Sequence, residues 1–103
     1  MCGILGLIAR DGLAIDGRQL QSALQSIRHR GPDDEGYLLY DPARREAVAL
    51  GGPDTVPELA LPPVAAAEPR RYRCAFGHRR LSIIDLTAAG HQPMRTADGR
   101  YWV

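Results

Sequence analysis

The first ten residues, MCGILGLIAR (residues 1–10), contain the clearest secondary-structure signal in the sequence. Residues 3–9 are almost wholly apolar, and the turn residues Arg10, Asp11 and Gly12 follow directly. A short apolar run that ends at turn residues is typical of a buried strand, because helices are usually longer and repeat every 3.6 residues. The sequence therefore predicts a buried strand from Gly3 to Ala9.

A helix follows this strand. Asp16 and Gln19 have the three-residue spacing of an N-terminal capping box. The apolar residues after them recur at helical spacing, at Leu20, Ala23, Leu24 and Ile27. We predict a helix from about Gly17 to His29, because the Gly31-Pro32 pair cannot continue it.

Several strand-like segments come after the helix. Tyr37–Tyr40 and Ala47–Leu50 are separated by a turn at Asp41-Pro42. Arg73–His78 is a further candidate strand, residues 81–84 form a second apolar stretch, and a last strand opens near Arg100. Strands around one early helix indicate an α+β domain with stacked layers.

Residues 51–70 differ in composition from the rest of the chain. They hold five prolines, a Gly-Gly pair and three consecutive alanines. We interpret them as an irregular surface insertion within one domain that occupies residues 1–103, because strand-like sequence resumes at Tyr72.

The last five residues, Gly99–Val103, are an aromatic and β-branched run with no turn to close it. They are typical of the first half of a strand. We therefore expect a fragment of a longer protein, truncated at its C-terminus. A short natural edge strand is the other interpretation.

Composition excludes several classes of protein. The 13 Lys and Arg against 12 Asp and Glu give a net charge of +1, which indicates neither a nucleic-acid nor a membrane-surface partner. No apolar run approaches the roughly 18 residues that span a bilayer, and no basic segment precedes the first apolar run as in a signal peptide. Two distant cysteines favour a reduced, cytoplasmic setting, and no metal-binding spacing of Cys or His is present, so no metal site is expected.

Cys2 is a candidate nucleophile because of its position. Removal of Met1 would leave Cys2 with a free α-amine, which titrates near about 7.7–8.0, close to a thiol at about 8.5. One residue would then carry both the nucleophile and its base. Position alone favours the other interpretation, an incidental small apolar residue at the start of a strand, and the neighbouring motifs reverse that preference.

Two basic segments accompany Cys2. RHRGPD, residues 28–33, places three basic or titratable side chains at a helix end, as either a solvated tip or an anion-binding feature. In HRRLSIID, residues 78–85, strand alternation predicts that Arg79 and Arg80 point to opposite faces, with one solvated and one turned inward. An inward guanidinium needs a carboxylate partner, which an amino-acid ligand would supply. A pair of surface arginines is the alternative.

These motifs together resemble a known family. MCGI at residues 1–4, RHRGPD at 28–33, RLSIID at 80–85 and HQPM at 91–94 have the order and rough spacing seen in glutamine-dependent asparagine synthetases. The chain resembles the N-terminal class II glutamine amidotransferase domain of those enzymes over its whole length except residues 51–70. The start at Cys2 alone is common to all class II amidotransferases.

The resemblance implies a fold and a site. The fold would be the four-layer α/β/β/α sandwich of the N-terminal nucleophile hydrolases. Cys2 would be the catalytic residue, forming a γ-glutamyl thioester with glutamine and releasing ammonia. Arg80 would bind the α-carboxylate of L-glutamine, and four further residues would line the pocket beside it: Leu81, Ser82, Ile83 and Ile84.

The resemblance also implies partners. The glutaminase domain would need no cofactor, whereas a C-terminal synthetase domain, absent from this sequence, would use ATP, Mg²⁺ and aspartate to make asparagine. A homodimer is the assembly that we consider.

In the family, an Asn-Gly pair that forms the oxyanion hole would follow Val103, and an acidic residue that binds the glutamine amine would come later. Loss of one oxyanion donor typically costs about 10²–10³ in rate, so we expect residues 1–103 alone to be inactive. A related amidotransferase with another acceptor, or a non-catalytic truncated remnant, are the alternative functions.

Overall fold

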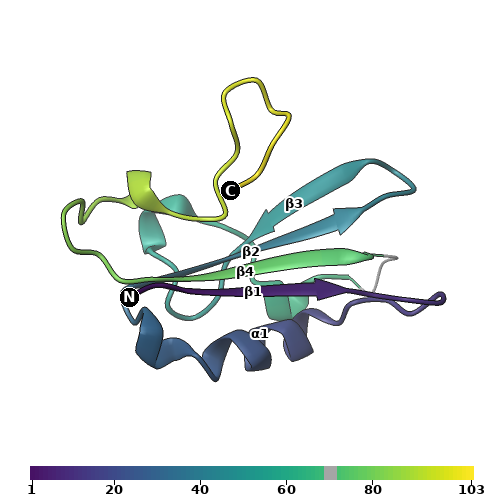
Figure 1. The fold of residues 1–103 in the computed structure, drawn as a ribbon, viewed down its shortest axis with the longest axis horizontal. Coiled ribbons are helices and arrows are strands. Elements are labelled where there is room, and N and C mark those ends of the chain that lie inside the picture. The colour runs from purple at the N-terminus through teal and green to yellow at the C-terminus, as the bar shows by residue number, and fades with distance from the viewer. Residues whose placement is uncertain (69–71) are drawn as a thin grey trace.

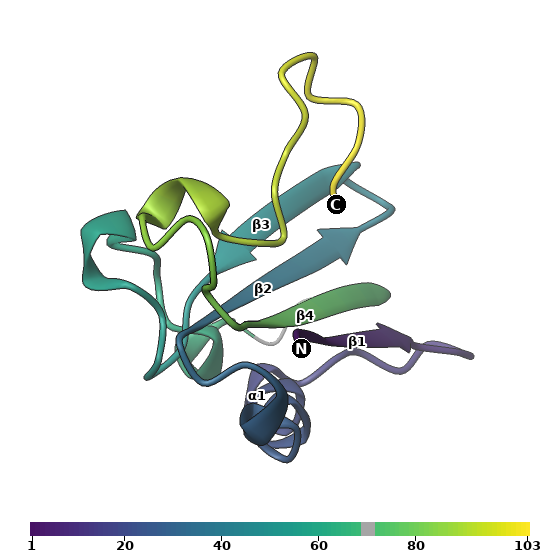
Figure 2. The same cartoon turned by 60° about the vertical axis from the view of Figure 1, so that its left-hand side comes forward.

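The computed structural model describes residues 1–68 and 72–103, which form a small α+β domain. Its strands are β1 (Gly3–Ile8), β2 (Asp34–Asp41), β3 (Glu46–Leu50) and β4 (Cys74–Arg80). They form one sheet in the order β1-β4-β2-β3, and every neighbouring pair is antiparallel. The long helix α1 (Gly17–Gln25) lies against one face of this sheet (Figures 1 and 2).

Short 3₁₀ helices complete the fold. They are η1 (Arg28–Arg30), η2 (Pro57–Leu59), η3 (Val64–Ala66) and η4 (Ala88–Gly90). Among the described residues, none of these helices, nor α1, has the length and apolar character to cross a membrane.

The helix begins where the sequence predicts and ends earlier. The Asp16 side chain accepts a hydrogen bond from the backbone N of Arg18 at 2.8 Å and caps the first turn. Ile27 leaves helical geometry, with φ of −107° and ψ of 19°, so the chain continues as η1 instead of extending α1 to His29. The predicted end at His29 is therefore wrong, because Gly31 must turn close to β4.

The core lies between α1 and the sheet. Leu20 and Leu24 of α1 are fully buried against sheet residues that include Leu39 and Ala75. A Cβ on Gly77 would lie 3.1 Å from the side chain of Leu24, so the absence of a side chain there lets the helix approach β4 closely. This contact fixes the distance between the helix and the central strands.

The opposite face of the sheet is open over β1. Leu5 and Leu7 face α1, whereas Ile4 and Ile8 are 81% and 80% exposed. The prediction of a strand was correct, but the prediction that both of its faces are buried was wrong. Within the described residues, α1 covers one face of β1 and nothing comparable covers the other.

The segment that we expected to be a surface insertion is irregular and also reaches the core. Residues 51–68 contain η2 and η3, and Val64 within η3 is fully buried against α1. The last two residues of the predicted insertion, 69 and 70, lie outside the described residues.

The chain after β4 contains no further strand among the described residues. Residues 81–84 form a loop, and the last residues fold back in a hairpin-like turn with a single bridge between Arg95 and Trp102. Backbone hydrogen bonds of 2.7 and 2.8 Å join Met94 and Val103. The strand expected near Arg100 is thus one bridged pair that stands away from the sheet (Figure 2).

Candidate active site

Cys2 lies at the corner where the first residues meet the end of β4. Gly3 pairs with Arg79 across the sheet, which places Cys2 beside the residues that follow β4. The backbone N of Leu81 donates to Cys2 Sγ at 3.4 Å, and the carbonyl O of Leu81 lies 3.9 Å from the same sulfur. The thiol is exposed, so a reagent or substrate can reach it.

The turn that contains RHRGPD packs against this corner. A Cβ on Gly3 would lie 3.0 Å from Ile27 Cδ1 and 3.2 Å from Arg30 Cβ. A Cβ on Gly31 would lie 2.5 Å from the backbone carbonyl carbon of Arg79. Close approach to the backbone of β4 requires glycine at position 31, and at Gly3 a side chain would press against Ile27 and Arg30. These contacts hold residues 28–33 against the start of β1 and the end of β4.

Asp33 connects the same turn to the loop after β4. Its backbone N donates to the carbonyl of Arg80 at 3.1 Å, and its carboxylate accepts from the backbone N of Ser82 at 2.8 Å. The RHRGPD and RLSIID motifs are therefore hydrogen-bonded to each other beside Leu81, which contacts the Cys2 thiol, although they are about fifty residues apart in sequence.

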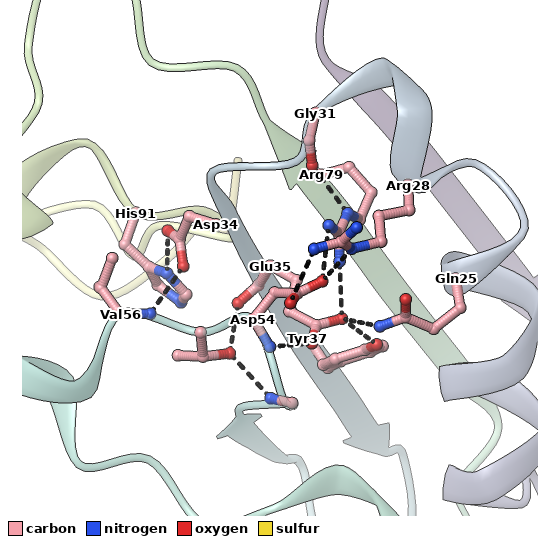
Figure 3. A network of polar contacts seen from close by, with 12 residues as sticks. Gln25, Arg28, Gly31, Asp34, Glu35, Tyr37, Asp54, Val56, Arg79 and His91 are labelled. Atoms are coloured by element: carbon pink, nitrogen blue, oxygen red, sulfur yellow. Dashed lines mark hydrogen bonds and ion pairs between the residues drawn. The ribbon is translucent and has the colours of Figure 1, made fainter.

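Arg79 is the centre of a buried ionic network (Figure 3). Its side chain is fully buried, and its Nε donates to the carbonyl of Gly31 at 2.8 Å. Its two terminal nitrogens each donate to a carboxylate at 3.0 Å, Nη1 to Glu35 and Nη2 to Asp54. Because protein carboxylates neutralise this guanidinium, it needs no ligand to be buried.

Glu35 and Asp54 are held by further donors. Glu35 Oε2 accepts from the Tyr37 hydroxyl at 2.6 Å, and burial, followed by this hydrogen bond, raises the pKa of Tyr37. Arg28 binds Asp54 at 2.6 Å, and this hydrogen bond is the main cause that lowers the pKa of the Asp54 carboxyl. The network therefore contains two carboxylates and two guanidinium groups, and its charges balance.

Arg80 is also buried, with 8% of its surface exposed. Its Nη1 donates to the carbonyl of Thr87 at 2.7 Å, and its Nη2 donates to the carbonyl of Asp85. The expectation that one of the two arginines would be solvated was wrong. Both are covered, because the loop after β4 folds back and presents its carbonyl groups to Arg80.

The other residues predicted to line a glutamine pocket lie in different environments. Leu81 is half-buried at the Cys2 thiol, and Ser82 is held by Asp33. Ile83 is exposed, and Ile84 is 97% exposed. The structure thus places the segment from Arg80 to Ser82 beside Cys2 in space. The contacts of all four pocket residues with glutamine remain predictions.

The sequence reasoning missed a pair that anchors the far end of this loop. His91 Nδ1 lies 2.7 Å from Asp34 Oδ2, and the other oxygen of Asp34 accepts from the backbone N of Val56 at 3.1 Å (Figure 3). The strand β2 starts at Asp34 and buries both Asp34 and Glu35. One signal in the sequence could have indicated this pair: Asp34 directly follows the RHRGPD motif, and His91 is the first residue of the HQPM motif.

His78 lies on β4 opposite Gly36, where the ring of His91 packs. Burial lowers the pKa of His78, and its Nδ1 is buried without a hydrogen-bond partner among the described residues. Within residues 1–68 and 72–103, no group of His, Cys, Asp and Glu side chains could hold a metal ion.

Comparison with known proteins shows which proteins the chain is similar to. Residues 65–103 match the family model of the glutamine amidotransferase domain. The chain is 33% identical, over 91% of its length, to a protein of Methanocaldococcus jannaschii described as a glutamine-hydrolysing asparagine synthetase. It is 29% identical, over its full length, to asparagine synthetase 1 (glutamine-hydrolysing) of Bacillus subtilis.

A third relative has a different description. An amidase of Gibberella zeae is 29% identical over 96% of the chain. The chain spans only 13%, 12% and 12% of the lengths of these three relatives. No solved structure matches the chain. Residues 65–103 thus match the glutamine amidotransferase domain, and the chain is similar, over most of its length, to glutamine-hydrolysing asparagine synthetases.

Proposed function

We propose that this chain carries the glutaminase chemistry of a glutamine-hydrolysing asparagine synthetase, with Cys2 as its nucleophile. The observation that carries the proposal is the position of the Cys2 thiol. It is exposed, and it contacts the backbone of Leu81 in the RLSIID motif. A nucleophile at the chain terminus is thereby held beside the segment expected to bind glutamine.

The chemistry follows from an N-terminal cysteine. After removal of Met1, the α-amine of Cys2 accepts the thiol proton, and the thiolate attacks the side-chain amide carbon of glutamine. The carbon–nitrogen bond breaks, and ammonia leaves with a proton returned by the amine. Water then hydrolyses the γ-glutamyl thioester to glutamate and regenerates the thiol.

Arg80 is proposed to bind the α-carboxylate of glutamine. The described hydrogen bonds that hold its guanidinium go to neutral carbonyl oxygens of Asp85 and Thr87. These contacts orient the side chain without neutralising its charge, which stays available to a carboxylate. Arg79, in contrast, is already paired with two carboxylates. Leu81, Ser82, Ile83 and Ile84 would form the pocket beside Arg80.

We also propose that the domain is part of a four-layer α/β/β/α sandwich. The sheet has a helix on one face and exposed apolar residues on the other, among them Ile4, Ile8 and Phe76. A cleft of about 270 Å³ between Ile4, Phe76, His78 and Trp102 lies on that open face. A second sheet packed there would bury this apolar surface.

We also propose an acceptor for the ammonia and the partners of this domain. Ammonia would pass to a synthetase domain that uses ATP, Mg²⁺ and aspartate, in a cytoplasmic protein, with a homodimer as the assembly to test by light scattering. The similarity to an amidase favours a second candidate, in which the ammonia or the amide chemistry serves another acceptor.

The nucleophile can be tested in the protein of natural length. A glutamine-analogue electrophile should label Cys2, and Cys2→Ala should abolish glutamine hydrolysis while leaving ammonia-dependent synthesis. Mass spectrometry of the N-terminal peptide and a glutamate assay provide the readouts. Normal glutamine hydrolysis by Cys2→Ala would refute the assignment, and active protein that retains Met1 would refute the α-amine as base.

A further inference from the structure

Arg79 joins the two segments that surround Cys2. It is fully buried, and its three nitrogens bind three different parts of the chain: the carbonyl of Gly31, the carboxylate of Glu35 on β2 and the carboxylate of Asp54 (Figure 3). A planar guanidinium can donate hydrogen bonds in three fixed directions at once, whereas a lysine ammonium on its flexible stem cannot reproduce this geometry.

The contact with Gly31 lies at the end of β4, where the strand pairs with the start of β1. Arg79 is paired across the sheet with Gly3, the residue after Cys2. Two residues beyond Arg79, the backbone N of Leu81 donates to Cys2 Sγ. On the other side, the turn at Gly31 packs against the backbone of Arg79, and the neighbouring Arg30 packs against Gly3.

The network has several partners beyond the Arg79–Glu35 ion pair. The Arg79–Glu35 pair is completely buried on both sides, and Glu35 also accepts from Gln25, Tyr37 and the backbone N of Asp54. Buried ion pairs are often replaceable by apolar residues without loss of stability. Stability alone therefore does not account for a buried ion pair at this place, and the contact of Arg79 with Gly31 gives the pair a role in geometry as well.

We propose that Arg79 is a positioning residue for the Cys2 nucleophile. It acts by holding the Gly31 turn and the end of β4 together, so that the Leu81 N–H is directed at the Cys2 sulfur. An N–H donor stabilises negative charge on sulfur, so loss of this alignment makes Cys2 a weaker nucleophile. The inference rests on the proposed function, because it assigns the contact to the same thiol.

The test separates positioning from stability. Three variants of the protein of natural length are compared with wild type: Arg79→Met, Arg79→Lys, and the double variant Arg79→Met with Glu35→Met. The double variant removes both buried charges together and leaves Asp54 paired with Arg28. Its thermal stability should therefore recover toward wild type, whereas the contact with Gly31 stays lost.

The main readout is the rate at which iodoacetamide alkylates Cys2, followed by mass spectrometry of the N-terminal peptide. All three variants should react about two- to tenfold more slowly than wild type, which corresponds to the net free energy of one hydrogen bond. Tyr37→Phe is the matched control, because it removes a donor to Glu35 without touching Gly31, and its alkylation rate should equal that of wild type.

Two results would overturn the inference. One is a wild-type alkylation rate in the double variant or in folded Arg79→Lys. The other is a failure of all three variants to fold, since the role of Arg79 would then be structural. Alkylation needs no glutamine, so the result stands even if wild-type protein does not hydrolyse glutamine, which would refute the proposed function alone.

Discussion

At the scale of the residue, Cys2 shows how little a position says before its neighbours are known. A cysteine after the initiator Met is compatible with an incidental strand start. The contact of its sulfur with Leu81, 79 residues away in sequence, places it in a site built from three segments. The antiparallel pairing of β1 with β4 makes that contact, because Gly3 and Arg79 are opposite one another.

Arg80 is the residue whose role in binding can be tested most directly. Arg80→Ala should raise the KM for glutamine by about 10–100-fold, because it removes a charge-assisted contact with the α-carboxylate. Steady-state glutaminase kinetics measure this effect. Arg10→Ala, which alters an exposed arginine after β1, is the control and should leave KM unchanged. Equal KM values for the two variants would show that Arg80 does not bind the carboxylate.

At the scale of the element, three strands and the start of the helix were predictable, whereas the end of α1, the start of β2 and the absence of a strand near Arg100 from the described residues were not. Period and capping residues are local, so β1, β3, β4 and the start of α1 lie within about two residues of their predicted positions. The strand β2 begins three residues earlier than predicted, at Asp34, because pairing with β4 extends it through two acidic residues. Sequence periodicity contains no information on that pairing.

The ionic network that ties these elements predicts a pH dependence. The pKa of Asp54 is lowered in the folded protein from its ordinary value of 3.8, chiefly by the hydrogen bond to Arg28. A lowered pKa in the folded protein means that the unfolded chain binds more protons in this pH range. The contribution of Asp54 to stability is therefore fully present well above pH 3.8 and is lost as the pH drops below that value.

Denaturant unfolding at a series of pH values measures this dependence. Asp54→Asn should be less stable than wild type at pH 6, and its free energy of unfolding should fall less steeply between about pH 5 and pH 3. The difference between the two proteins should be constant from pH 6 to pH 8. Parallel curves throughout the acid range would contradict a lowered pKa for Asp54.

At the scale of the whole molecule, the two faces of the sheet differ. One face packs on α1 (Figure 2), where Leu20 and Leu24 are fully buried, and the other face exposes Ile4 and Ile8. Exposed apolar residues gathered on one surface usually mark an interface. This asymmetry is the physical reason to propose a second sheet on the open face.

Truncation of one exposed isoleucine tests the second sheet. In the protein of natural length, Ile8→Ala should lower the free energy of unfolding by about 2–5 kcal/mol if the second sheet buries it. Leu13→Ala, a similar change in an exposed loop outside the sheet, should stay within about 0.5 kcal/mol. Chemical denaturation of both variants provides the comparison, and equal small effects would mean that the face of β1 stays open.

The sequence by itself determined the α+β class, the positions of the main elements and the motifs that mark a glutamine amidotransferase, since these depend on local periodicity and on short runs of residues. Only the tertiary structure decided that Arg79 pairs with Glu35 and Asp54, that Arg80 is held by carbonyl groups and that Leu81 contacts Cys2. Those contacts join residues 5 to 79 positions apart in the sequence. They depend on strand register and on close packing at Gly31 and Gly77, and no local pattern in the sequence encodes either feature.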